Sequence, residues 1–494
     1  MIDLSLFHEL SEIDARTFTR GEVDIAKKLY NSFLEIDYLK EFPLNNKLVA
    51  TDEEDLVRFN HMALLEKGGK DLVVLVNVLD DPPISPKFDN YDIFNTKAML
   101  FNSKVIFNEL SKTLNNGNFL VINICDRFGH NLGIEKAVNT LIEFLDRDFS
   151  IKALITTNDY TTLSGNAVFF GCQGIYRPAV FVGGKIVRTS ELYKGLDPAG
   201  VLSSIIRSLT LNISCMDTLQ NEISEPIYVS KLLVPGGNEL STQEWGYASF
   251  VTSSVTRNPS DYLLDFKNYV EKSYNLYLNE MNSKISSYLY KRKVDFKENE
   301  LTPKVYTWSE YLNELITIRG NTVLTAINNR INQILNNNSD ISEDELRLLA
   351  VRYVYDNFKI SDKPVIIVYY DALPENRVDI TGKTDAEREL MTSVTRALNL
   401  VDSSIKKRFF YPEQSFQSYF NISDEFRDLK NLIKDLPYAR KSYEDRIRNA
   451  EKLNIPTVNI GGVFGVDCCD IDKDYLFEKI PNIIIKTIEK LLEE

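Results

Sequence analysis

Histidine, cysteine and tryptophan are scarce in this chain of 494 residues, which contains 3, 5 and 2 of them. So few histidines leave little imidazole for binding zinc, whose protein ligands are imidazole, thiolate and carboxylate groups. The cysteines are Cys125, Cys172, Cys215, Cys468 and Cys469. Their odd number and the lack of zinc-finger spacing favour free thiols in a reducing cytoplasm.

Long apolar runs and excess positive charge are also missing. No apolar run reaches the roughly 20 residues of a membrane span, and the first segment, MIDLSLFHELSEIDARTF, has acids where a signal peptide needs an apolar core. The chain has 57 basic and 71 acidic side chains, which gives a formal net charge of −14. Nucleic acids and anionic membranes attract basic surfaces. We therefore expect a cytoplasmic protein that binds neither.

The N-terminal part of the chain alternates buried strands with helices. Continuous Val, Ile and Leu runs predict strands at 71–79, 118–125 and 152–157. Amphipathic stretches predict helices between them, at 101–114 and 133–145. Strands that are buried on both faces and joined by crossover helices are typical of a mainly parallel sheet.

The pattern changes near residue 180. Alternation in GYASFVTSSVT (246–256) is typical of a half-exposed antiparallel strand. A long helix is predicted from Ser260 to about Tyr290, and Ser342 and Glu345 have the spacing of a helix-capping box.

Runs typical of parallel strands return at 364–372 and 455–463. A chain of this length is expected to form two or three domains. We predict a discontinuous α/β domain made of residues 1–180 and 306–494, with an α+β domain inserted at 181–305.

Several sequence strings occur in the same order as in the zinc-dependent exopeptidases of the aminoacylase, carboxypeptidase and desuccinylase type (clan MH). They are RFNHMALL (58–65), IFNTKAM (93–99), GIEKAV (133–138), GGKIVRTSELYKGLDPAG (183–200) and IPTVNIGGVFGVDCC (455–469). The chain therefore resembles this family, and within it the arginine-utilisation type. The resemblance implies an α/β hydrolase-like body with a mainly parallel central sheet. It also implies an inserted ferredoxin-like α+β lid, through which relatives dimerise.

Enzymes of this family hold two zinc ions that are bridged by a carboxylate and an activated water. The resemblance assigns the family's site positions to residues of this chain. The first motif places Val78 at a histidine ligand and Asp80 at an aspartate. The second places Asn95 at the bridging aspartate, and the third places Arg127 at the general base and Phe128 at a ligand.

The remaining positions also differ from the family pattern. Asn158, with Asp159 beside it, stands at a carboxylate ligand, and Cys469 stands at the last histidine. Arg188 stands at the lid histidine that helps to bind the reacting carbonyl. The resemblance thus implies that most of the ligand set has been replaced.

Of the residues that carry the family's chemistry, only Asp80 remains. Val78 and Phe128 have no donor atoms, and neutral Asn95 cannot balance a dication as a carboxylate does. Arg127 would repel zinc and cannot serve as a general base near neutral pH. The sequence therefore predicts that the metal ligands and the general base are lost, and that no cofactor is bound.

We expect a non-catalytic relative whose cleft binds an amino-acid- or peptide-like ligand, with Asp80, Arg127, Asp159 and Arg188 as candidate binding residues. An ion pair between Arg127 and Asp80 is expected in place of the metal bridge. Two alternatives stay open. One is an amide hydrolase of amino-acid or arginine metabolism, metal-dependent or rebuilt around Asp80, Arg127, Asp159 and Cys469. The other is a structural subunit that forms a homodimer through the lid.

Overall fold

The computed structural model describes most of the chain, in two compact units. The described residues are 3–17, 19–51, 57–81, 89–127, 131–158, 160–161, 166–235, 241–294, 304–338, 341–361, 363–440, 442–464 and 472–493. Unit 1 comprises Met1–Gln173, Arg377–Ser423 and Asp445–Glu494, and unit 2 comprises Gly174–Asn376 and Asp424–Glu444. Phe128, Asp159, Cys468 and Cys469 lie outside the described residues.

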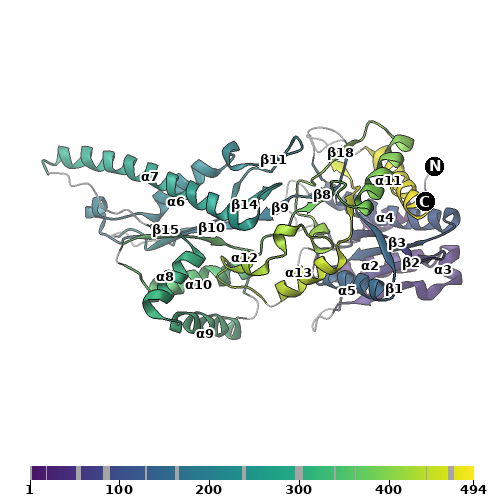
Figure 1. Cartoon of the computed structure of the whole chain (residues 1–494), viewed down its shortest axis with the longest axis horizontal. Coiled ribbons are helices and arrows are strands. Elements are labelled where there is room, and N and C mark those ends of the chain that lie inside the picture. Colours follow the sequence, from purple (N-terminus) through teal and green to yellow (C-terminus); the bar gives the residue numbers. More distant parts are fainter. Residues whose placement is uncertain are drawn as a thin grey trace. The chain divides into compact units, whose positions relative to one another are not determined.

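Unit 1 is built on a sheet of eight described strands (Figure 1). In spatial order they are β1 (Asn46–Ala50), β2 (Phe59–Glu66), β4 (Asn118–Ile124), β3 (Asp71–Val78), β5 (Ser150–Thr156), β19 (Thr457–Asn459), β7 (Ala167–Phe169) and β18 (Lys406–Arg408). β3 pairs in parallel with β4 and β5, and β5 pairs in parallel with β19. The predicted mainly parallel core is therefore confirmed.

Helices cover both faces of this sheet, which explains the continuous apolar strands. The main ones are α2 (Arg20–Phe33), α4 (Asp89–Thr113), α5 (Leu132–Asp146), α11 (Asp385–Val401) and α14 (Ile480–Glu493). Val73 and Leu75 of β3 belong to the core cluster that contains α4 and α14. Val74 and Val76 point to the other face and belong to the cluster that contains α5. A strand buried on both faces needs apolar residues at every position.

Unit 2 contains a second sheet, with helices on both of its faces (Figure 1). Its strands are β13 (Tyr228–Leu233), β14 (Trp245–Ser254), β10 (Pro178–Gly183), β16 (Val365–Tyr370) and β15 (Lys304–Thr307), with β9 (Gly174–Tyr176) on β14. One face carries α6 (Pro198–Leu209) and α7 (Pro259–Lys291), and the other carries α8 (Trp308–Arg319), α9 (Thr322–Asn337) and α10 (Glu343–Asn357).

The boundary of unit 2 differs from the predicted range 181–305. The apolar run at 364–372, which we predict to belong to the α/β body, forms β16 of unit 2 instead. β16 pairs antiparallel with β10 and parallel with β15. An apolar run identifies a buried strand but not the sheet that the strand joins, because strand pairing depends on distant segments.

Two local predictions are also corrected. β14 is antiparallel, as predicted, but it is buried almost throughout rather than half exposed, because helices cover both faces of its sheet. Ser342 stands at the N-cap of α10, as the predicted capping box requires, but its side chain makes no capping hydrogen bond.

The shorter elements complete the described structure. They are α1 (Ser5–Ser11), α3 (Asp37–Glu41), α12 (Leu429–Ile433), α13 (Ser442–Leu453), β6 (Tyr160–Thr161), β8 (Gly171–Cys172), β11 (Thr218–Leu219), β12 (Glu222–Ile223), β17 (Val378–Asp379) and β20 (Val463–Phe464). In the part of the chain that the structure describes, no helix is long and apolar enough to cross a membrane. Cys125, Cys172 and Cys215 are buried.

Candidate functional site

The candidate site lies in unit 1, where the parallel strands end. Carboxyl ends of parallel strands meet at one edge of a sheet, the usual place for the chemistry of α/β proteins. Val78 is the last residue of β3 and packs against the core cluster beside α5. Asp80 and Asp81 follow it, and Asp126 and Arg127 follow β4. The position implied for a histidine ligand is thus filled by a hydrocarbon side chain.

Asp80 and Asp81 are both buried, and each carboxylate has partners within the chain. Asp80 accepts a hydrogen bond from the Thr17 hydroxyl, with 2.5 Å between oxygens. Asp81 Oδ2 accepts from the backbone N–H of Ala15 at 2.8 Å. Asp81 Oδ1 lies 2.7 Å from Lys97 Nζ, and neither side chain is more than 1% exposed. An ammonium group therefore balances the Asp81 charge.

Lys97 lies on α4 in the same IFNTKAM string that contains Asn95. Burial lowers the pKa of the Lys97 ammonium, while attraction to Asp81 acts in the opposite direction. Sequence reasoning used this string to place Asn95 and did not assign a role to Lys97. A lysine within an apolar helix segment such as AMLF could have signalled a buried partner.

A second buried ion-pair network contains Glu22, Arg58 and Asp126, which sequence reasoning also missed. Arg58 Nη1 lies 2.6 Å from Asp126 Oδ1 and 3.5 Å from Glu22 Oε2, and all three side chains are fully buried. The backbone N–H of Asp126 donates to Glu22 Oε1. Burial raises the pKa of Glu22 to about 7; the nearby Asp80 charge adds to this rise, and Arg58 opposes it.

Asn95 and Asn158 both lie against the backbone of Gly461 and Gly462, which follow β19. A Cβ atom at Gly462 would lie 2.8 Å from Asn95 Cγ, and one at Gly461 would lie 1.9 Å from the carbonyl oxygen of Asn158. The structure thus brings these two candidate positions to one glycine pair. The buried atoms Asn95 Nδ2 and Asn158 Oδ1 have no hydrogen-bond partner among the described residues.

The side chain of Asn459, the last residue of β19, holds this arrangement in place. Its Nδ2 donates to the Asn158 carbonyl, and its Oδ1 accepts from the Asn158 backbone N–H, both at 2.8 Å. Its Oδ1 also accepts from Thr156 Oγ1 at 2.9 Å. The backbone of Asn158 is therefore positioned independently of its own side chain.

The two candidate arginines have different surroundings. Arg127 is buried; its Nη1 donates to Asn131 Oδ1 at 3.4 Å, and its Cζ lies 5.9 Å from the centre of the Phe416 ring. The contacts described for Arg127 and Asp80 do not include the ion pair expected between them, which stays a prediction. Arg188 is exposed and lies in unit 2, just before a short 3-10 helix, Thr189–Lys194.

A chain of hydrogen bonds crosses the sheet of unit 1. The Thr157 hydroxyl donates to Asn77 Oδ1 at 2.6 Å, and Asn77 Nδ2 donates to Asn123 Oδ1 at 2.7 Å. Asn123 Nδ2 donates to His61 Nδ1, and His61 Nε2 donates to Asn46 Oδ1, both at 2.8 Å. Because an amide nitrogen can only donate, the imidazole must be neutral, with its proton on Nε2. Burial lowers the pKa of His61 to about 3.

The donor set at these strand ends does not fit zinc. Asn95 offers a neutral amide, and two buried cations, Lys97 and Arg58, lie beside the carboxylates that a metal would need. Across the described ranges, no group of three or more His, Cys, Asp or Glu side chains is arranged to hold a metal ion.

Sequence comparisons with known proteins find a relative that covers most of the chain. No family model matches the chain. It is 22% identical to the protein RocB of Bacillus subtilis (strain 168) over 412 residues, which cover 78% of this chain and 69% of RocB.

Two solved structures resemble the whole chain. The M20 family metallo-carboxypeptidase Sso-CP2 from Sulfolobus solfataricus is 10% identical, with a TM-score of 0.50, over 99% of this chain and 100% of that one. The di-peptidase Dug1p from Saccharomyces cerevisiae is also 10% identical, with a TM-score of 0.50, over 99% and 96%. The predicted resemblance to the zinc-dependent exopeptidases and the predicted α/β fold are confirmed. The chain is therefore similar to RocB over most of its length and has the fold of the M20 metallopeptidases.

Proposed function

We propose that this protein is a non-catalytic relative of the M20 metallopeptidases, and that it binds an amino-acid- or peptide-like ligand without hydrolysing it. The observation that carries this proposal is the pairing of strand-end carboxylates with buried cations, Asp81 with Lys97 and Asp126 with Arg58. A metal bound by these carboxylates would leave the cations buried without their partners, which is strongly unfavourable.

The ligand class follows from two unsatisfied amide atoms. Asn95 Nδ2 is a donor and Asn158 Oδ1 is an acceptor, and both are buried without a partner among the described residues. Buried polar atoms are usually hydrogen-bonded, so a ligand that pairs both would lower the free energy of the complex. A peptide-like amide offers both a carbonyl oxygen and an N–H. Arg127 is our candidate for binding a ligand carboxylate, because guanidinium groups bind carboxylates in a bidentate manner.

The loss of catalysis is tested by metal content and hydrolysis together. Purified protein is incubated with Zn²⁺ or Co²⁺, dialysed, and analysed by mass spectrometry, and samples are assayed with dipeptides and N-acetyl amino acids. We expect far less than one metal ion per chain and no hydrolysis above background. Stoichiometric metal together with turnover would contradict the proposal.

Ligand binding is tested separately by calorimetric titration with the same compounds. We expect Asn95→Ala and Asn158→Ala each to weaken binding about tenfold, because each removes one buried hydrogen bond. Asn115→Ala, at an exposed position of unit 1, is the matched control and should bind as the unmodified protein does. Equal binding by all three variants would place the ligand elsewhere.

One observation favours the second candidate function, a rebuilt amide hydrolase. Glu22 lies near Asp80 and its pKa is raised to about 7, a value suited to a general base. Glu22 is fully buried and its Oε1 accepts from Asp126, so a substrate cannot reach it without local opening. We therefore rank this function second. Any hydrolysis should rise with pH through about 7 and disappear in Glu22→Gln.

A further inference from the structure

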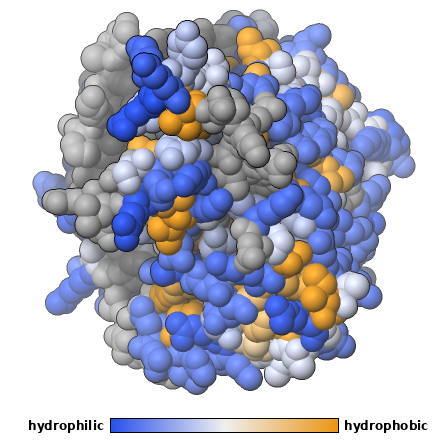
Figure 2. Space-filling model, turned by 90° about the vertical axis from the view of Figure 1, so that its left-hand side faces the viewer, coloured by the Kyte–Doolittle hydropathy of each residue, from blue (hydrophilic) through white to orange (hydrophobic). Residues whose placement is uncertain are grey.

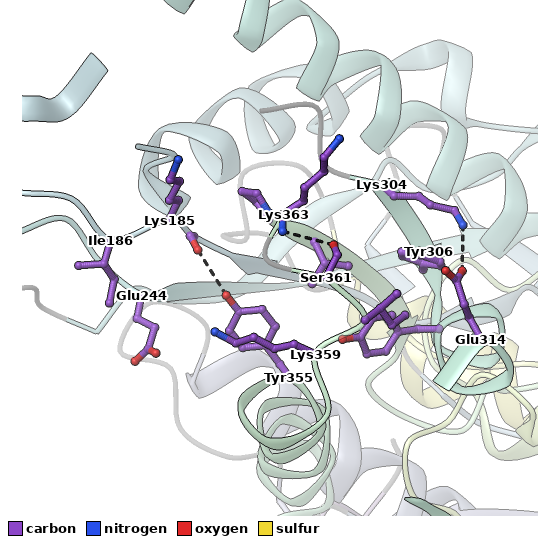
Figure 3. A pocket seen from close by; sticks show the side chains of 15 residues that line it. Lys185, Ile186, Glu244, Lys304, Tyr306, Glu314, Tyr355, Lys359, Ser361 and Lys363 are labelled. Atoms are coloured by element: carbon purple, nitrogen blue, oxygen red, sulfur yellow. Dashed lines mark hydrogen bonds and ion pairs between the residues drawn. The ribbon is translucent and has the colours of Figure 1, made fainter. Parts of the chain in front are cut away.

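Unit 2 contains a pocket that shares no residue with the candidate site of unit 1. Its cavity volume is about 490 Å³ (Figure 3). It is lined by residues of β15, α8 and α10, by the segment that leads into β16, and by residues 184–186 and Glu244. Tyr306, Tyr311 and Tyr355 line it and are each at most 6% exposed. This volume lies within the range of roughly 300 to 1,000 Å³ that is typical of small-molecule sites.

Four lysines from three segments of the chain line this pocket (Figure 3). Lys185 follows β10, Lys304 is the first residue of β15, Lys359 follows α10, and Lys363 precedes β16. The fold thus brings positive charges from distant parts of the sequence to one pocket, although the whole chain has a formal net charge of −14. Local excess of one sign attracts ligands of the opposite sign.

The acidic residues in the lining balance only part of this charge. Lys304 forms an ion pair with Glu314 at 2.9 Å. Lys185, Lys359 and Lys363 form no ion pair with any described residue, and Glu244 is the other carboxylate of the lining. The lining therefore holds four lysines and two glutamates, Glu244 and Glu314, so its formal charge is positive.

The Tyr311 hydroxyl adds a neutral donor. Tyr311 is 2% exposed, and its hydroxyl makes no hydrogen bond to any residue that the structure describes. By contrast, the Tyr355 hydroxyl donates to the Gly184 carbonyl at 3.3 Å, and Lys304 lies 4.4 Å from the centre of the Tyr306 ring. Burial raises the pKa of Tyr311, so its hydroxyl stays protonated near neutral pH.

We propose that this pocket binds a small organic anion, whose carboxylate or phosphate group is held by Lys185, Lys359, Lys363 and the Tyr311 hydroxyl. The apolar part of the ligand packs against the tyrosine side chains of the lining. Lysine ammonium groups act as point charges, so the site accepts either kind of oxyanion. The proposal does not depend on the function proposed for unit 1.

The test is calorimetric titration of the full chain at low ionic strength. Phenyl phosphate, benzoate, inorganic phosphate and benzylammonium serve as probes, so that the type of oxyanion, the aromatic part and the charge are varied separately. We expect phenyl phosphate or benzoate to bind with a Kd below about 1 mM, and affinity to fall when salt is added. Benzylammonium should not bind.

Variants localise this binding to the pocket. Lys359→Gln/Lys363→Gln is expected to weaken binding of the aromatic anion at least about tenfold, and Tyr311→Phe about threefold to tenfold. The control Lys272→Gln/Lys291→Gln removes the same charge from exposed positions of α7 and should leave Kd unchanged. Tyr311→Phe removes a hydroxyl that bonds to no described residue, so the fold should be retained.

Three results would overturn the proposal. One is that neither aromatic anion binds. The second is equal weakening in the pocket variant and in the control variant, which would indicate long-range charge effects. The third is equal affinity for inorganic phosphate and phenyl phosphate, which would exclude an organic ligand.

Discussion

Lys97 and Asp81 form the buried ion pair on which the proposed function depends most. Lys97→Met leaves the Asp81 carboxylate buried without its cation, so we expect the free energy of unfolding to fall by about 3 to 5 kcal/mol. Urea unfolding at neutral pH measures the change. Lys104→Met on the same helix breaks an exposed pair with Glu35 and should cost less than about 1 kcal/mol.

A double variant distinguishes charge from packing at this position. In Lys97→Met/Asp81→Leu both charges are absent, and part of the lost stability should return, because replacing a buried pair by apolar residues is often tolerated. If the single and double variants are equally unstable, the ion pair is not the cause of the loss.

Protonation of His61 makes the stability of the folded protein depend on pH, and the sign of this dependence follows from the pKa shift. Its pKa is about 3 in the folded protein and about 6.5 in an unfolded chain. The unfolded state therefore binds more protons in this window, and the contribution of His61 to stability decreases as pH falls from about 6.5 towards 3. Above this window the contribution is fully present.

This slope is measured by urea unfolding at pH 7 and pH 5, comparing the protein with His61→Gln. The comparison is needed because Glu22, with its raised pKa, contributes the opposite slope as pH rises from about 4.5 towards 7. We expect the variant to lose less stability on acidification than the unmodified protein. The same loss in both would show that His61 is not the titrating group.

At the scale of elements, the turn after β19 packs closely against the backbone of Asn158 in the candidate site. In Gly461→Ala the new Cβ would lie 1.9 Å from the Asn158 carbonyl oxygen, so the backbone must shift. We expect a loss of about 1 to 3 kcal/mol in thermal or urea unfolding, together with weaker ligand binding. Gly320→Ala, where φ is +74° and open space surrounds the position, should cost about 1 kcal/mol without affecting binding.

The elements themselves follow closely from local sequence. The runs at 71–79 and 118–125 form β3 and β4, because a helix-covered parallel sheet requires apolar residues on both faces. The run at 364–372 is also a strand, but its sheet could not be predicted from its own residues. Nor could the coverage of β14 on both faces, because this depends on helices from distant parts of unit 2.

At the scale of the whole molecule, a homodimer through unit 2 stays a prediction. β13 is an edge strand and exposes Tyr228, Leu232 and Leu233 by 51%, 56% and 45%. Edge strands with exposed apolar side chains offer unpaired backbone groups to a second chain. The face drawn in Figure 2 is mostly hydrophilic, with hydrophobic residues in small separate patches. Pairing of β13 with its copy in a second chain would bury these three side chains.

Light scattering of the purified protein measures this directly. We expect the mass of two chains, and a shift to one chain in Leu232→Lys, because a buried unpaired charge opposes association. Leu400→Lys, at an exposed position of α11 in unit 1, is the control and should remain dimeric. A monomeric unmodified protein would contradict the prediction.

The sequence by itself determined the order of strands and helices, the family resemblance and the identity of the residues at the positions that the resemblance assigns to metal ligands. These properties depend on local periodicity and on side-chain chemistry, which can be read residue by residue. The tertiary structure alone decided that β16 joins unit 2, that Lys97 meets Asp81, and that Arg58 meets Asp126 from 68 residues away. Such contacts depend on long-range packing, because the local sequence around a residue does not identify the distant residue that it contacts.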